Sequence, residues 1–300
     1  MKGPIDPRWY QIGVLACLLV YGLSSLHFEV SWLQGLVTLA SVLVFQALLT
    51  PIVGLRFFEW KSALISGLSL CLLMRSNALA LVVLASFLTI GSKFFLRFNG
   101  KHIFNPTNFG IGITVLMTGQ AWVSPGQWGS GLLIAVFVFC CGLMVVQRAE
   151  RSDVTLTFLL AYPGLFFGRA LWLGDPLTIP LHQLSNGALL IFTFFMISDP
   201  ITTPNSRTGR ILFALLVASL AYVLRFKFYN PNALIYSLLI SSMFVPAFDY
   251  FLIGPRFDWT GHGQNPQNKP TLEVTRMEAP VKFGNKWSLN LRRLGISHLF

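Results

Sequence analysis

The stretch Arg97-Phe-Asn-Gly-Lys-His-Ile-Phe-Asn-Pro-Thr-Asn-Phe-Gly-Ile111 places a short basic segment directly before Asn-Pro and an apolar run. This order is typical of the start of a helix, because Asn caps the first turn and Pro fits the first helical position. A second copy follows as Arg225-Phe-Lys-Phe-Tyr-Asn-Pro-Asn-Ala-Leu-Ile235. The residues before each copy, 80–87 and 214–220, also resemble each other. We interpret the chain as an internal repeat.

Composition indicates a membrane protein. Of the 300 residues, 54% are hydrophobic and 11% are charged, and the mean hydropathy is +0.64. A soluble domain does not need so much apolar sequence. The formal net charge of +11 is assigned to membrane topology, because Lys and Arg accumulate in cytoplasmic loops. The expected partner is therefore the lipid bilayer, and no nucleic acid is expected.

The apolar runs predict an all-α membrane protein with about ten transmembrane helices. Several runs are shorter than the roughly 20 residues that a straight spanning helix needs, so we expect broken or half helices. The runs cover residues 10–26, 30–49, 63–73, 78–90, 107–117, 129–146, 154–173, 184–197, 211–224 and 232–251.

The distribution of Lys and Arg favours cytoplasmic N- and C-termini, because the predicted inner loops then hold most of the basic residues. Each repeat contains five predicted spans. An odd number forces the two halves to enter the membrane in opposite directions, which predicts two inverted five-helix repeats. We expect a membrane domain at 1–253, with repeats at about 1–120 and 125–253, and a polar basic tail at 254–300.

A second informative motif follows the eighth run. Ser198-Asp199-Pro200 and Thr202-Thr203-Pro204 combine short hydrogen-bonding side chains with two prolines, which predicts a loop of fixed shape. In this apolar setting Asp199 needs a cationic partner, and Arg207 or Arg210 is nearest in sequence. A capped loop with a surface ion pair is the alternative interpretation.

Three segments together carry a resemblance to a known family: Asn99-Gly-Lys-His-Ile-Phe-Asn-Pro106, His182-Gln-Leu-Ser-Asn-Gly187 and Phe194-Phe-Met-Ile-Ser-Asp-Pro-Ile-Thr-Thr-Pro204. In this order, and over roughly residues 57–251, the chain resembles the RnfD/NqrB family, whose members belong to the Rnf electron-transport complex and the sodium-pumping NADH:quinone oxidoreductase. The resemblance implies a urea-transporter-like fold. It also implies a membrane flavoprotein that passes electrons within a bacterial inner-membrane complex moving sodium ions or protons.

The resemblance implies a flavin cofactor as well. In the family, FMN is attached to a threonine of a Ser-Gly-Ala-Thr motif between the repeats. Residues 118–129 lack that motif, although Thr118 and Ser124 supply hydroxyls there. We therefore expect a non-covalent flavin, either FMN or riboflavin, or a quinone. The candidate cofactor-binding residues are Asn105, Thr107, Asn108, His182, Asp199, Thr202 and Thr203.

Two other functions remain open. A passive channel or transporter for a small solute would use the same broken helices without redox chemistry. A scaffold would recruit a soluble redox partner through the basic tail. No motif for a catalytic triad, phosphate loop or zinc site occurs, so no catalytic or metal-ligating residues are assigned. His102 lies in a basic segment and is expected to be solvated.

Overall fold

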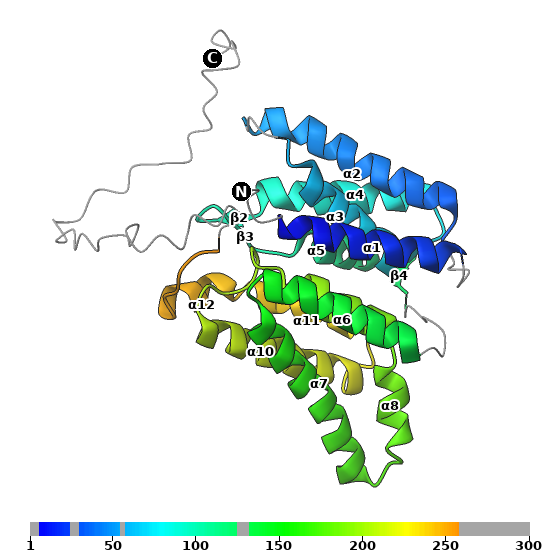
Figure 1. Ribbon diagram of the computed structural model, residues 1–300, viewed down its shortest axis with the longest axis vertical. Coiled ribbons are helices and arrows are strands. Elements are labelled where there is room, and N and C mark those ends of the chain that lie inside the picture. The colour runs from blue at the N-terminus through cyan, green and yellow to red at the C-terminus, as the bar shows by residue number, and fades with distance from the viewer. Residues whose placement is uncertain (1–5, 25–29, 55–57, 125–131, 258–300) are drawn as a thin grey trace, which may run out of the picture. The chain divides into compact units, whose positions relative to one another are not determined.

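The computed structural model describes residues 6–24, 30–54, 58–124 and 132–257 (Figure 1). The chain divides into two units, Met1–Trp259 and Thr260–Phe300, and all described residues belong to the first. The predicted tail from residue 258 onward lies outside the described residues. The helices are α1 Pro7–Ser24, α2 Trp32–Ile52, α3 Trp60–Leu73, α4 Leu79–Phe95, α5 Pro106–Thr118, α6 Leu132–Arg148, α7 Ser152–Leu173, α8 Thr178–Leu184, α9 Gly187–Ile191, the π-helical η1 Phe192–Met196, α10 Arg207–Phe226, α11 Ala233–Ser242 and α12 Val245–Phe251.

Every apolar run predicted from the sequence contains a helix. By length and composition, three helices of the described residues, α2, α7 and α10, can cross a bilayer. The number rises to five if two bent pairs each form one span: α8 with α9 and η1, bent by 60°, and α11 with α12, bent by 44°. A helical multi-pass membrane protein is therefore supported, and the number of ten spans stays a prediction.

The two bends have local causes. At the first bend, Asn186 interrupts the helix and caps the next one, because its Oδ1 accepts a hydrogen bond of 2.8 Å from the Ala188 N–H. The following segment continues as a π-helix, a form found mostly as single turns and often at functional sites. At the second bend, Pro246 occupies the first turn of α12, where its missing N–H costs no helical hydrogen bond.

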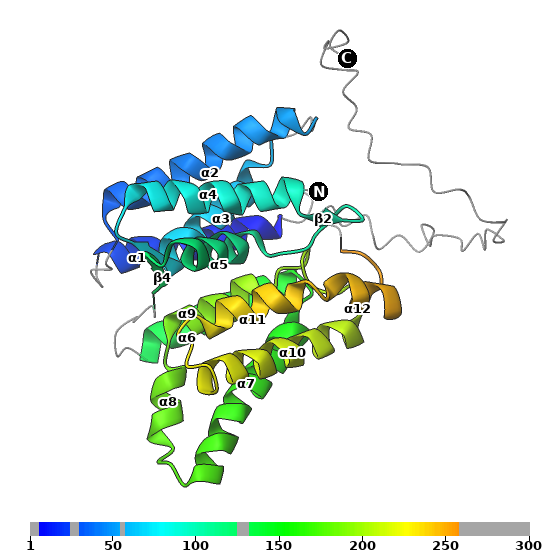
Figure 2. The same ribbon diagram turned by 180° about the vertical axis from the view of Figure 1, so that it is seen from behind.

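Helix α5 lies beside α11 in the interior of the unit (Figure 2). Helix α5 begins next to β2, at the side where α11 leads into α12, so the two helices run in opposite directions (Figure 2). Their approach is close, because a Cβ atom placed on Gly112 would lie 3.2 Å from Ile235 Cγ2. Each half also repeats its internal packing: α4 packs on α2 and α5, and α10 packs on α7 and α11.

Two short antiparallel ribbons join the helices. β1 Met74–Ser76 pairs with β4 Ala121–Val123, and β2 Arg97–Phe98 pairs with β3 Lys101–His102. The hairpin of β2 and β3 turns at Asn99 and Gly100, which have φ angles of 49° and 74°. Positive φ at both turn residues matches the twist of a two-residue hairpin. The hairpin delivers the chain directly to the start of α5.

Helix α4 packs on α5 at Gly110. A Cβ atom there would overlap Thr89 Oγ1 and lie 2.7 Å from the Ala85 carbonyl oxygen. We expect Gly110→Ala to destabilise the protein by about 1 to 3 kcal/mol, because overpacking forces the helices apart. The thermal unfolding midpoint in detergent measures this effect. Gly164→Ala is the control, since nothing lies within 4 Å of that Cβ position; equal midpoints for the two variants would contradict the prediction.

Candidate functional site

Asn105 joins the two motifs that the sequence singled out. Its Oδ1 accepts a hydrogen bond of 3.1 Å from the Asn108 N–H and thereby caps α5. Its Nδ2 lies 3.4 Å from both the Met196 carbonyl oxygen and Asp199 Oδ2. The start of α5 is therefore bonded to the end of η1 and to the Ser-Asp-Pro loop.

The next two polar residues of α5 reach other helices. Thr107 Oγ1 lies 3.4 Å from the Ser66 carbonyl oxygen of α3, and Asn108 Nδ2 donates to the Ile235 carbonyl of α11 at 3.1 Å. Thr107 and Asn108 are buried. Asn105, Thr107 and Asn108, the three predicted residues at the start of α5, thus hold η1, α3 and α11 around one helix end.

Asp199 organises the loop that follows η1. Its Oδ1 accepts from the Ile201 N–H at 3.1 Å, and its carbonyl oxygen accepts from the Thr202 and Thr203 N–H groups. Burial raises the pKa of the Asp199 carboxyl, although the Ile201 N–H and the charges of Lys93 and Arg151 oppose that shift.

The predicted partnership of Asp199 with Arg207 or Arg210 is wrong. Arg210 forms an ion pair with Asp153 at 2.6 Å, and Arg207 is exposed at the start of α10. The cations that act on Asp199 are Lys93 and Arg151. They come from other parts of the chain, because tertiary packing and not sequence distance brings them to the loop.

Two cations hold Thr203. Arg151 donates through Nε to Thr203 Oγ1 at 2.9 Å and through Nη2 to the Pro200 carbonyl at 3.2 Å. Lys101 Nζ donates to the Thr203 carbonyl at 2.6 Å. Burial and the charge of Arg210 lower the pKa of Arg151 to about 10, so the guanidinium stays charged at neutral pH. Thr202 is also buried, and its Oγ1 lies 3.5 Å from the Asp199 carbonyl.

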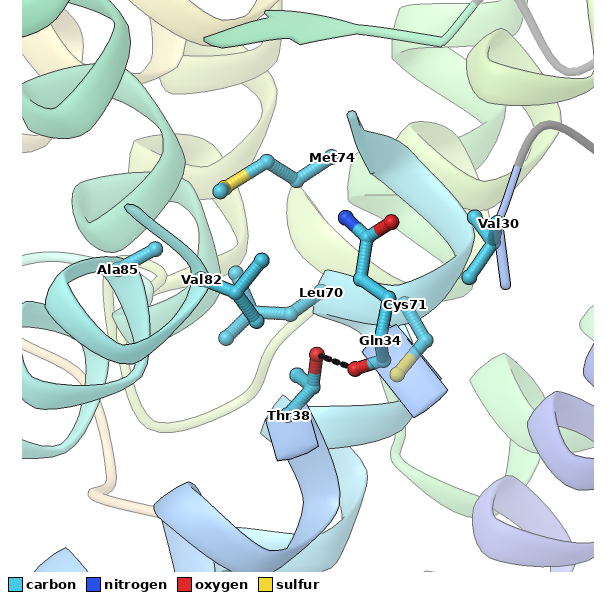
Figure 3. Close-up of a pocket in the computed structure, with 8 residues that line it drawn as sticks. All are labelled: Val30, Gln34, Thr38, Leu70, Cys71, Met74, Val82 and Ala85. Atoms are coloured by element: carbon cyan, nitrogen blue, oxygen red, sulfur yellow. Dashed lines mark hydrogen bonds between the residues drawn. The ribbon is translucent and has the colours of Figure 1, made fainter. Parts of the chain in front are cut away.

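The cavity beside Asp199 is small, about 30 Å³. A second enclosed space, between α2, α3 and α4, measures about 10 Å³, and the Thr38 hydroxyl there donates to the Gln34 carbonyl (Figure 3). Either volume suits one or two waters. Neither of these two spaces has room for a flavin or quinone ring.

A larger cavity of about 300 Å³ opens behind the same residues, and we call it the aromatic cavity. Its volume falls at the lower end of small-molecule sites. The residues that line it are Leu73, Val123, Ser124, Tyr162, Phe166, Gln183, Asn186, Ala188, Leu189, Phe192, Met196, Arg225, Pro231, Asn232, Ala233, Leu234 and Ile235.

Stacked rings form one wall of the aromatic cavity. The ring centroids of Tyr162 and Phe166 lie 4.7 Å apart, and Phe158 links Tyr162 to Phe192 at 5.3 and 5.4 Å. Phe166 continues to Phe226 at 4.9 Å. Such contacts fix the ring planes by more than their buried area alone, so the wall is preorganised for a flat ligand.

The predicted motifs approach this cavity from behind. Met196 and Ile235 line it, and their carbonyl oxygens are the ones that face Asn105 and Asn108. Asn105 and Asn108 therefore support the cavity wall. Gln183 and the second Asn-Pro copy, through Pro231, line the cavity directly.

His182, the remaining predicted residue, is exposed on α8, and none of the hydrogen bonds described above reaches it. Sequence reasoning missed Tyr162, Phe166 and Arg225. The spacing of aromatic residues at 158, 162 and 166 was a signal, because positions four apart share one helix face.

The family model described as NQR2, RnfD, RnfE matches residues 113–257. This confirms the predicted resemblance to that family. The matched segment contains every residue lining the aromatic cavity except Leu73. It does not include Asn105, although the resemblance was expected from about residue 57.

Curated relatives point the same way. The chain is 30% identical over 109 residues to the RnfD-type component of an ion-translocating oxidoreductase complex from Psychromonas ingrahamii, which covers 36% of this chain and 31% of that protein. The protein of the same name from Erwinia tasmaniensis is 28% identical over 148 residues, 49% of this chain and 38% of that protein. The chain thus spans about a third of the length of these relatives.

The expectation that His102 is solvated is wrong. It is partly buried, and its Nδ1 has no hydrogen-bond partner within the described ranges. Burial and the charges of Arg97 and Lys93 lower the pKa of His102 to about 3. The imidazole is therefore neutral at physiological pH.

We expect His102 to make the fold sensitive to acid. Between pH 6.5 and 3 the unfolded chain binds a proton at this imidazole that the folded chain excludes, so stability falls as pH falls. His102→Gln should remove this loss. Unfolding midpoints of both proteins at about pH 7 and pH 5 measure it; the wild type should lose more stability on acidification, and parallel losses would refute the assignment.

Proposed function

We propose that this chain is a membrane component of an RnfD/NqrB-like electron-transport system in the bacterial inner membrane, and that it holds a flavin or quinone without a covalent bond. The observation that carries the proposal is the aromatic cavity, which lies almost entirely within the family-matched segment. The relatives are named as subunits of an ion-translocating oxidoreductase complex, which supports further subunits as partners of this chain.

The lining of the aromatic cavity fits such a ring. Tyr162 and Phe166 offer faces for stacking, and Gln183 and Asn232 offer amide groups that both donate and accept hydrogen bonds. Arg225 places one cation at the same cavity. A bound flavin or quinone would supply the electron acceptance and release, while the protein orients it and limits water access.

The predicted site residues have a supporting role in this proposal. Asn105 and Asn108 hold the carbonyl groups of Met196 and Ile235, and thereby the cavity wall that these two residues form. Asp199, Thr202 and Thr203 fix the loop that follows η1. Thr107 ties the same helix end to α3.

The helix packing supports the proposal of two inverted repeats with a urea-transporter-like fold. α1 contacts α6, α3 contacts α9, and α5 contacts α11. Each pair joins helices that the repeat predicts to correspond. The opposite directions of α5 and α11 (Figure 2) are what an axis in the membrane plane would produce. Coupling of electron transfer to sodium or proton movement is part of this proposal.

The first test is the absorbance spectrum of the detergent-purified protein before and after acid precipitation. Flavin in the supernatant is the expected result, since no attachment motif is present. A quinone would be detected in an organic extract of the same sample. A protein with neither would overturn the redox assignment and favour a passive channel, and fluorescence retained by the protein on a gel would show covalent attachment.

The position of the ring is tested with Phe166→Leu. We expect flavin or quinone occupancy to fall roughly threefold to tenfold, because one aromatic contact contributes about 0.5 to 1.5 kcal/mol. Trp172→Leu is the control, since Trp172 is 88% exposed on α7. Unchanged occupancy in Phe166→Leu would exclude the aromatic cavity as the binding site.

Asn105 is tested with two variants. Asn105→Ala loses both the cap and the Nδ2 contacts, whereas Asn105→Ser keeps a capping oxygen and loses only those contacts. We expect both variants to insert into the membrane and both to lose bound ligand. Full occupancy in Asn105→Ser would show that the contacts to Met196 and Asp199 do not support the site.

A further inference from the structure

A second large cavity, of about 730 Å³, opens between the hairpin of β2 and β3 and helix α12. We call it the basic hollow, and the residues that define it are Phe98, Lys101, His102, Asn205, Asp249 and Arg256. It lies at the end of α5 opposite to the aromatic cavity's Ser124, because the hairpin precedes α5 and Ser124 follows it. The basic hollow is therefore a separate site.

Its single lining carboxylate is already used. Asp249 Oδ2 accepts from Lys101 Nζ at 2.7 Å, and Asp249 Oδ1 accepts from the Asn205 N–H at 2.7 Å. Lys101 Nζ also donates to the Asn205 side chain at 3.2 Å. Lys101 and Asp249 thus neutralise each other and fix the floor of the hollow.

Two guanidinium groups remain at the rim. Arg256 donates to the carbonyls of Asn99 and Gly100 at 3.3 and 2.7 Å, and Arg97 follows α4 directly. Across the described residues, neither arginine has a carboxylate within ion-pair distance. Partial burial and the charge of Arg256 lower the pKa of Arg97, so the two cations repel each other and an anion between them would relieve the repulsion.

The rest of the hollow is apolar. Val245, Pro246, Ala247 and Ile253 line it, and Tyr250 and Ile253 are 78% and 89% exposed. Arg256 carries donors in a planar fork that suits phosphate oxygens. Guanidinium groups at the rim beside an apolar wall, at the ends of membrane helices, match the phosphate and the adjoining chains of a lipid.

We propose that the basic hollow binds the phosphate of an anionic phospholipid, with the lipid chains against α12. The hairpin carries the cations and α12 carries the apolar contact, so a bound lipid joins the segment before α5 to the segment after α11. Lys101 links this site to the loop of Asp199, because the same ammonium donates to the Thr203 carbonyl.

The test measures binding of short-chain phosphatidylglycerol to the whole chain in detergent by native mass spectrometry. Arg256→Gln should weaken binding about tenfold, the scale of one charge-assisted hydrogen bond. Arg207→Gln is the control, since Arg207 is exposed and lies outside the hollow. Equal affinity in Arg256→Gln and wild type would overturn the proposal.

A second pair of variants leaves the hydrogen bonds of the hairpin intact. Ala247 lies on the apolar wall, so Ala247→Glu should weaken binding by charge repulsion and Ala247→Lys should not. Zwitterionic phosphatidylcholine should bind at least about tenfold more weakly than phosphatidylglycerol. Equal binding of the two lipids would overturn the proposal, and so would inorganic phosphate binding as tightly as the lipid, because the site would then recognise free phosphate.

Discussion

The fold depends on the hydrogen bonds made by the two amide side chains at the start of α5. A helix that begins inside an apolar protein leaves N–H groups without partners, and a helix that ends there leaves carbonyl groups. Asn105 caps the first set through Oδ1, and the Nδ2 groups of Asn105 and Asn108 face carbonyl groups of η1 and α11. The broken helices can meet in the interior because these amides supply the missing partners.

Interrupted helices also explain where polar chemistry can occur in a largely apolar protein. The breaks expose amides and carbonyls that a continuous helix would use internally. In this chain they border the aromatic cavity, whose rings are fixed by contacts along α7 and with η1. A ring-sized space with a few oriented polar groups is what binding of a planar redox ligand requires. The protein then controls orientation and access, and the ligand supplies the redox chemistry.

Charged residues gather on the other side of the same helix end. Lys101 contacts the Thr203 carbonyl and Asp249, so it connects the loop after η1 with α12. Arg151 holds the same loop from the start of α7. The loop therefore lies between the supports of the aromatic cavity and the basic hollow, and its shape depends on both.

The sequence by itself determined the helical runs, the two Asn-Pro helix starts and the Ser-Asp-Pro loop, because apolar length, capping and proline act locally. It also carried the family resemblance through short motifs. Only the tertiary structure decided that Asp199 lies near Lys93 and Arg151 and not beside Arg210, and that Tyr162 and Phe166 face a cavity. A stripe of aromatic residues on an apolar helix is compatible with a packed core, a lipid-facing surface or a cavity wall. The choice among these is made by the packing of segments far apart in the chain, which local sequence patterns do not encode.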